Sequence, residues 1–170
     1  IIATGPQTNV AALLLAHPEL KGKIREISIM GGGFRNGNWT AAAEFNIIED
    51  PEAAKIEFES GIPLTVCGLD VTEKALVTPS DREKVKEIGN EVSDVVAGWL
   101  DFFFKHHKEL GWSGSPLHDP CAVLVLTHPE IFEIKEIYAE VETKGKYCRG
   151  ATIGDFKNIA KKEPNVKAVV

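Results

Sequence analysis

The chain has 170 residues, 44% hydrophobic and 26% charged, values close to those of ordinary globular proteins, which excludes a disordered chain or a fibrous repeat. Its 25 acidic and 19 basic residues give a formal net charge of -6, which argues against a general nucleic-acid-binding surface because such a surface needs a basic patch. No stretch approaches the roughly 18 consecutive apolar residues of a membrane span. A small-molecule partner, with no nucleic acid and no membrane, fits this composition best.

Alternating extended and helical patterns occupy the first seventy residues. We expect strands at residues 1–3, 24–30 and 62–69, and helices at residues 9–16 and 51–59, the second capped by Asp50 with Pro51 behind it. This alternation favours an α/β fold in which helices flank a mostly parallel sheet. Ligands of such sheets bind beyond the carboxyl ends of the strands, so the turn at residues 31–33 would border the site. The strand at residues 1–3 would be an unpaired edge unless another polypeptide covers it.

The second half of the chain is more helical. Residues 80–110 follow a helical pattern with a break near Gly89 and Asn90, followed by a loop at residues 111–116, a short helix at residues 119–127 and a strand at residues 131–141. The aromatic run at residues 102–104 is more typical of a core than of a binding surface. With no internal repeat and no convincing linker, we expect a single domain over residues 1–170.

The three cysteines are Cys67, Cys121 and Cys148. Their odd number, their wide spacing and the lack of a CxxC pair indicate neither a disulfide framework nor a zinc ribbon. The opening residues also lack the basic leader of a signal peptide. We therefore expect a reduced, cytoplasmic setting.

Glu44, Phe45 and Asn46 form a short polar motif around one aromatic residue. In an extended segment Glu44 and Asn46 would point the same way and Phe45 the other way. A carboxylate beside an amide can hold a vicinal diol such as that of ribose. The alternative is a surface loop with unrelated polar residues, and Asn38 after Gly37 could likewise be a turn residue.

His118, Asp119 and Pro120 have a structural explanation and a chemical one. Asp119 as a helix N-cap, with Pro120 at the first helical position, accounts for two of the three residues. His118 is then unexplained, and an imidazole can protonate a leaving group while the adjacent carboxylate binds a metal or a substrate hydroxyl. The glycines at residues 31–33 are no dinucleotide fingerprint, because Asn36 stands where GxGxxG needs glycine, so nicotinamide binding is rejected.

Four segments taken together resemble the inosine-uridine-preferring nucleoside hydrolase family. They read ATGPQTNVA, MGGGFRNGNWTAAAEFNIIEDPEAA, GLDVT and PLHDPCAV, and they follow the order of the family along almost the whole chain. The resemblance implies a Rossmann-like α/β fold and a calcium-dependent enzyme. Such an enzyme hydrolyses the N-glycosidic bond of ribonucleosides and releases ribose and the free base.

The resemblance also assigns roles to individual residues. Asn38, Glu44 and Asn46 would bind ribose hydroxyls, and Phe45 would lie against the sugar. Positive charge develops on the ribosyl ring as the base departs, so these polar groups would stabilise the transition state more than the substrate.

The metal and the proton donor are implied in the same way. Thr4 would offer its backbone carbonyl to Ca²⁺, Asp119 would bind Ca²⁺ and a ribose hydroxyl, and His118 would serve as general acid for the departing base. A hard cation with oxygen ligands would orient the diol and lower the pKa of its bound water.

The chain departs from the family pattern at both ends. The amino-terminal acidic loop of the DxDxGxDD type and the last helix are absent from these residues. We expect an incomplete portion of the full domain that is weakly active or inactive alone. The intact enzyme would be a homo-oligomer, and the acidic loop would be on a second polypeptide, cleaved off or left out of these residues. The alternatives are a non-catalytic nucleoside- or ribose-binding fragment and an interaction domain without ligand, and purine or pyrimidine preference stays open.

Overall fold

The computed structural model describes residues 1–170, and the chain divides into two compact units. The first unit comprises Ile1–Thr72 and His118–Val170, and the second comprises Glu73–Leu117. This division does not test the expectation of a single catalytic domain over residues 1–170, which stays a prediction. None of the helices combines the length and the apolar content that a membrane crossing requires.

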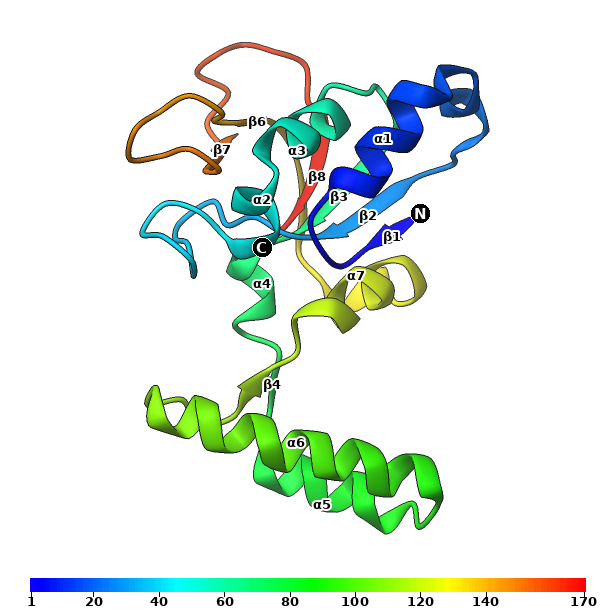
Figure 1. Cartoon of the computed structure of the whole chain (residues 1–170), viewed down its shortest axis with the longest axis vertical. Helices are drawn as coiled ribbons and strands as arrows, with labels where there is room; N and C mark the ends of the chain where they lie inside the picture. The colour runs from blue at the N-terminus through cyan, green and yellow to red at the C-terminus, as the bar shows by residue number, and fades with distance from the viewer. The chain divides into compact units, whose positions relative to one another are not determined.

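A six-stranded sheet is the framework of the first unit (Figure 1). In spatial order its strands are β1 (Ile2–Ala3), β2 (Ile27–Met30), β3 (Leu64–Cys67), β8 (Val166–Val169), β6 (Ile134–Val141) and β7 (Thr152–Asp155). The first four run parallel, whereas β6 is antiparallel to β8 and to β7. The predicted α/β fold with a mostly parallel sheet is confirmed, and β1 is an edge strand as expected.

Helices cover both faces of this sheet (Figure 1). They are α1 (Thr8–Ala16), α2 (Phe45–Glu49), α3 (Pro51–Phe58), α4 (Leu69–Thr72) and α7 (His118–Thr127), with the 3-10 helices η1 (Pro18–Lys23) and η2 (Pro129–Ile131). On one face, Leu14 of α1 and Phe58 of α3 share a core with alternate residues of β2 and β3. On the other face, Ser28 Oγ of β2 donates to the Ala122 carbonyl of α7 at 2.7 Å. Successive side chains of β2 therefore point to opposite faces of the sheet, and α7 packs on one face while α1 and α3 pack on the other.

Most element boundaries agree with the sequence patterns, and the differences have local causes. Asp50 caps α3 by accepting from the Ala53 amide, as predicted. The strand expected at residues 24–30 begins only at Ile27, because the Ile24 amide still donates to η1 carbonyls. The strand expected at residues 131–141 begins at Ile134, because η2 uses the residues before it.

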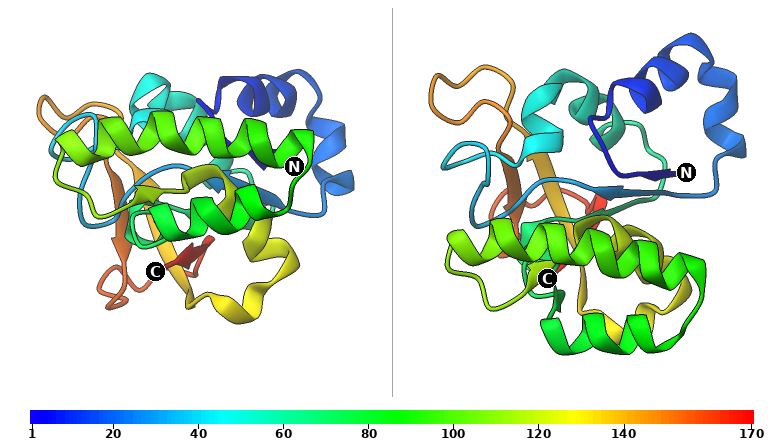
Figure 2. Two further views of the ribbon diagram at one scale, coloured as in Figure 1. Left: turned by 90° about the horizontal axis from the view of Figure 1, so that it is seen from below. Right: turned by 60° about the horizontal axis from the view of Figure 1, so that its bottom comes forward.

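The second unit is built around two helices (Figure 2). Its elements are β4 (Leu76–Val77), α5 (Pro79–Glu87), α6 (Glu91–Glu109) and β5 (Ser115–Pro116), and β4 pairs with β5. The predicted break is present: Gly89 has φ +70° and Asn90 caps α6 by accepting from the Ser93 amide. The loop expected at residues 111–116 contains β5.

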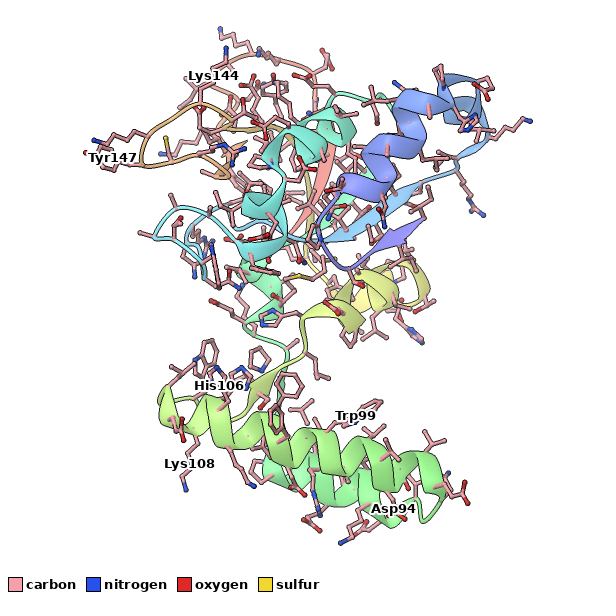
Figure 3. All side chains as sticks on the ribbon, viewed as in Figure 1. Asp94, Trp99, His106, Lys108, Lys144 and Tyr147 are labelled. Carbon is pink, nitrogen blue, oxygen red and sulfur yellow. The ribbon has the colours of Figure 1, made fainter.

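The aromatic residues of α6 are not core residues, contrary to the sequence interpretation. Trp99, Phe102 and Phe103 keep 64%, 71% and 51% of their surface exposed. Trp99 and His106 project from the same side of the helix (Figure 3), as their seven-residue spacing requires. The buried side of α6 is formed instead by small and aliphatic residues, Ser93, Ala97 and Leu100.

Candidate functional site

Glu44 connects the glycine turn after β2 to the start of α2. Its carboxylate accepts from the backbone amides of Asn46 at 2.9 Å, Ile47 at 3.3 Å and Gly32 at 2.8 Å, and the side chain is 2% exposed. The extended conformation predicted for residues 44–46 is therefore wrong, because Glu44 caps a helix that begins at Phe45. Glu44 and Asn46 still point away from Phe45 as expected, since the two polar residues are buried and Phe45 is exposed.

Asn46 ties together the carboxyl ends of β1 and β2. Its Nδ2 donates to the Met30 carbonyl at 2.9 Å and contacts the Met30 sulfur at 3.3 Å. The same nitrogen lies 3.5 Å from the carbonyl oxygen of Thr4, just after β1. Asn46 Oδ1 makes none of these bonds and is the atom left to accept from a ligand.

Asn38 lies on the loop between β2 and α2. Its Oδ1 accepts from the Phe45 amide at 2.9 Å, so it closes the loop and its Nδ2 remains a donor. The Phe45 ring packs edge-on against Trp39, with ring centroids 5.2 Å apart. Asn38 thus serves in a turn, as the structural interpretation proposed, and it also lies beside the exposed Phe45 ring.

His118 and Asp119 lie in the first turn of α7. The helix begins at His118, so Asp119 is not the residue before the helix as predicted, but a carboxylate in its first turn. His118 is partly buried, and its Nδ1 lies 2.8 Å from Thr72 Oγ1 of α4. Nδ1 of the imidazole therefore contacts a buried hydroxyl.

The electrostatics connect these separate elements. Burial raises the pKa of Glu44, backbone amides oppose the shift, and the negative charge of Asp119 adds to it. Desolvation also raises the pKa of Asp119 although the residue is exposed overall, and His118 opposes that shift. The charges of Glu44, which caps α2, and of Asp119, in the first turn of α7, therefore influence each other. The structure thus links Asn46 to the Thr4 carbonyl by a contact of 3.5 Å and places Glu44 within the electrostatic influence of Asp119.

The metal ligands inferred from the sequence do not make a closed site. No three His, Cys, Asp and Glu side chains are grouped so that they could hold a metal ion. The Thr4 carbonyl and the Asp119 carboxylate are oxygen donors of the kind Ca²⁺ prefers, but calcium takes six to eight of them. The residues of this chain therefore suit part of a calcium site in kind but not in number.

Two contributors to this site, Met30 and Thr72, escaped the sequence interpretation, whereas Gly32 lies in the turn that was expected to border it. The Gly32 amide donates to the Glu44 carboxylate, and the Met30 carbonyl accepts from Asn46 Nδ2. Thr72 Oγ1 contacts His118 Nδ1. Their signal was present in the motifs MGGG and GLDVT, but only the pairing of β2 with β3 shows that these segments end side by side.

The amino-acid sequence was also compared with models of known protein families. The model of the inosine-uridine preferring nucleoside hydrolases matches residues 1–170. The chain belongs to this family. The resemblance seen in its motifs is therefore confirmed.

Relatives of known sequence are longer than this nucleoside hydrolase chain. It is 54% identical over 172 residues to the pyrimidine-specific ribonucleoside hydrolase RihA of Salmonella paratyphi C, and the match covers 100% of the chain and 55% of the relative. The RihA protein of Shigella flexneri is 52% identical with the same coverage. The chain spans about half the length of these curated relatives.

Solved structures show the same partial coverage. The purine-preferring ribonucleoside hydrolase from Gardnerella vaginalis superposes with a TM-score of 0.91 at 36% identity, over 99% of this chain and 54% of that one. The plant nucleoside hydrolase PpNRh1 gives a TM-score of 0.92 at 31% identity, over 100% and 56%. The fold is thus that of nucleoside hydrolases.

Proposed function

We propose that this chain forms part of an enzyme that hydrolyses the N-glycosidic bond of ribonucleosides and yields ribose and the free base. Membership of the nucleoside hydrolase family supports the reaction class. The observation that carries the proposal is the position of Glu44 and Asn46 beside the carboxyl ends of β1 and β2, where parallel sheets bind ligands, with the charge of Asp119 acting on Glu44.

Ribose binding is assigned to the α2 side of the site. Glu44 and Asn46 accept from sugar hydroxyls, Asn38 donates through its amide, and the exposed Phe45 ring lies against the sugar. Glycosidic cleavage passes through an oxocarbenium-like state. The buried carboxylate of Glu44 stabilises that positive charge and needs little reorganisation, because backbone amides already hold it in place.

Departure of the base is assigned to α7. His118 delivers a proton to the leaving base, which otherwise departs as an anion. Asp119 holds a ribose hydroxyl and orients the sugar relative to the imidazole. Their adjacency in one helical turn fixes the distance between proton donor and sugar.

Metal dependence accompanies this family, and we propose Ca²⁺ as the metal. The Thr4 carbonyl and Asp119 would supply two of its oxygen ligands, and further ligands would come from outside this chain. The bound ion would supply orientation of the diol and a more acidic water. No step assigned to Glu44, Asn46 or His118 depends on its position.

The substrate class and setting complete the proposal. Because the RihA relatives are named pyrimidine-specific, uridine and cytidine are the substrates to test first. We also propose that the protein is a homo-oligomer and that it is located in the cytoplasm. The three cysteines without a disulfide agree with the proposed location. The alternative of a ribose-binding fragment without catalysis makes a different prediction: it binds uridine but does not release ribose.

The test is ribose release from uridine with added Ca²⁺. We expect the Asp119→Ala variant of the complete protein to lose at least about 100-fold in rate, because it loses a group that orients the sugar. Reducing-sugar formation measures the rate directly.

The matched control is Glu130→Ala, which removes another exposed carboxylate just after the far end of α7. We expect this variant to keep the wild-type rate. Equal loss in both variants, or uridine binding by the wild type without ribose release, would contradict the proposal.

A further inference from the structure

Thr72 is a buried hydroxyl residue directly beside the imidazole. It is the last residue of α4, its side chain is fully buried, and its Oγ1 lies 2.8 Å from His118 Nδ1. Its backbone amide donates to the Gly68 carbonyl at 3.0 Å. Thr72 is therefore fixed by its own helix and contacts the imidazole of His118.

Both sides of this contact are anchored to the sheet. On the α4 side, the Leu69 amide donates to the Gly32 carbonyl at 2.9 Å. A Cβ on Gly68 would lie 2.8 Å from that oxygen, so the close approach requires glycine. On the α7 side, Ser28 Oγ holds the Ala122 carbonyl at 2.7 Å. A hydrogen bond between two such anchored groups fixes the ring plane more firmly than a contact to a mobile side chain.

The chemistry of a hydroxyl defines which ring nitrogen carries the proton. The Thr72 side chain makes no other hydrogen bond, and a buried hydroxyl hydrogen without an acceptor is costly. With a neutral ring the hydroxyl therefore donates to Nδ1, which places the ring proton on Nε2. With a protonated ring the same oxygen accepts from Nδ1, so the contact persists in both forms.

We propose that Thr72 is a positioning residue for His118, which holds Nδ1 on the α4 side and so makes Nε2 the nitrogen that delivers the proton. This inference rests on the proposed role of His118 as general acid. Thr72 itself touches neither the base nor the sugar, and it acts through the orientation and tautomer of the imidazole.

The test combines ¹⁵N NMR of the histidine rings with kinetics on the complete protein. In the wild type with a neutral ring, we expect His118 to show an unprotonated Nδ1 and a protonated Nε2, assigned by loss of the signals in His118→Gln. Thr72→Val should give a mixture of tautomers and lower kcat about tenfold or more, with KM changed less than twofold. Thr72→Ser, which keeps the hydroxyl, should restore both readouts.

Thr65→Val is the matched control, because it removes another buried hydroxyl, one that bonds to Glu26 at 2.8 Å. We expect it to leave the His118 signals unchanged. The inference is overturned if Thr72→Val leaves the tautomer unchanged, if Thr72→Ser fails to restore it, or if Thr65→Val has the same effect. Failure of the wild type to release ribose would count against the proposed function alone, since the NMR comparison still decides the role of Thr72.

Discussion

At the scale of single residues, buried carboxylates in this chain have opposite surroundings. Glu44 accepts three backbone hydrogen bonds, whereas neither oxygen of the equally buried Glu57 has a hydrogen-bond partner. Burial alone raises the pKa of Glu57 to about 8. Backbone donors thus make the charged form of Glu44 tolerable, and their absence keeps Glu57 protonated at neutral pH.

Glu57 therefore makes stability depend on pH. In the unfolded chain its pKa is near 4.5 and in the folded chain about 8, so between these values the folded state binds more protons and stability falls as pH rises. Each pKa unit corresponds to about 1.4 kcal/mol, so the loss is several kcal/mol. We expect Glu57→Gln to flatten this slope in urea unfolding between pH 5 and pH 8.

The control for Glu57 is Glu49→Gln, which neutralises an exposed carboxylate on α2. It should keep the wild-type slope. A slope that is the same in the wild type and in Glu57→Gln would show that Glu57 ionises normally in the folded chain.

At the scale of elements, the glycine turn after β2 sets the position of Glu44. Gly32 has φ +79°, and a Cβ there would lie 2.8 Å from Thr152 Cγ2. Gly61 has a similar φ of +75°, but its Cβ would meet no atom within 4 Å. A side chain at Gly61 would therefore cause backbone strain alone, whereas a side chain at Gly32 would cause backbone strain and steric overlap.

Substitution by alanine at both glycines tests this difference. Gly61→Ala should cost about 1 kcal/mol, the usual penalty of the left-handed region. Gly32→Ala should cost about 2 kcal/mol more because of the overlap, and it should also lower ribose release by displacing the amide that Glu44 accepts from. Urea unfolding measures both free energies, and equal costs would contradict the steric account.

The elements also show what local sequence could predict. The cap at Asp50 and the break near Gly89 and Asn90 follow from short-range rules, and they were found where expected. The helix at Phe45 was missed because Glu44 caps it while also bonding to Gly32, twelve residues earlier. The contact between Thr72 and His118 spans 46 residues, so no local pattern could reveal it. The motifs located the candidate site residues, and tertiary packing determined their partners.

At the scale of the whole molecule, we propose that the chain supplies part of a larger catalytic centre. It covers about 55% of the RihA relatives, and its own residues provide too few ligands for a metal site. A cavity of about 490 Å³ lined by Lys55, Tyr138 and Asn165, among others, lies near the amino ends of β3 and β8, at the opposite edge of the sheet. Substrate is expected at the carboxyl edge, despite the volume of that cavity.

The central claim is that Asn38, Phe45, Asn46 and Asp119 surround a single ribose. It is tested most directly by backbone amide NMR of the ¹⁵N-labelled His118→Ala variant of the complete protein with uridine and Ca²⁺, since this variant lacks the proton donor and leaves uridine intact. We expect uridine to shift the amide signals of these four residues together, at a common saturation. Shifts confined to the cavity around Tyr138 and Asn165, with the four amides unmoved, would contradict the account.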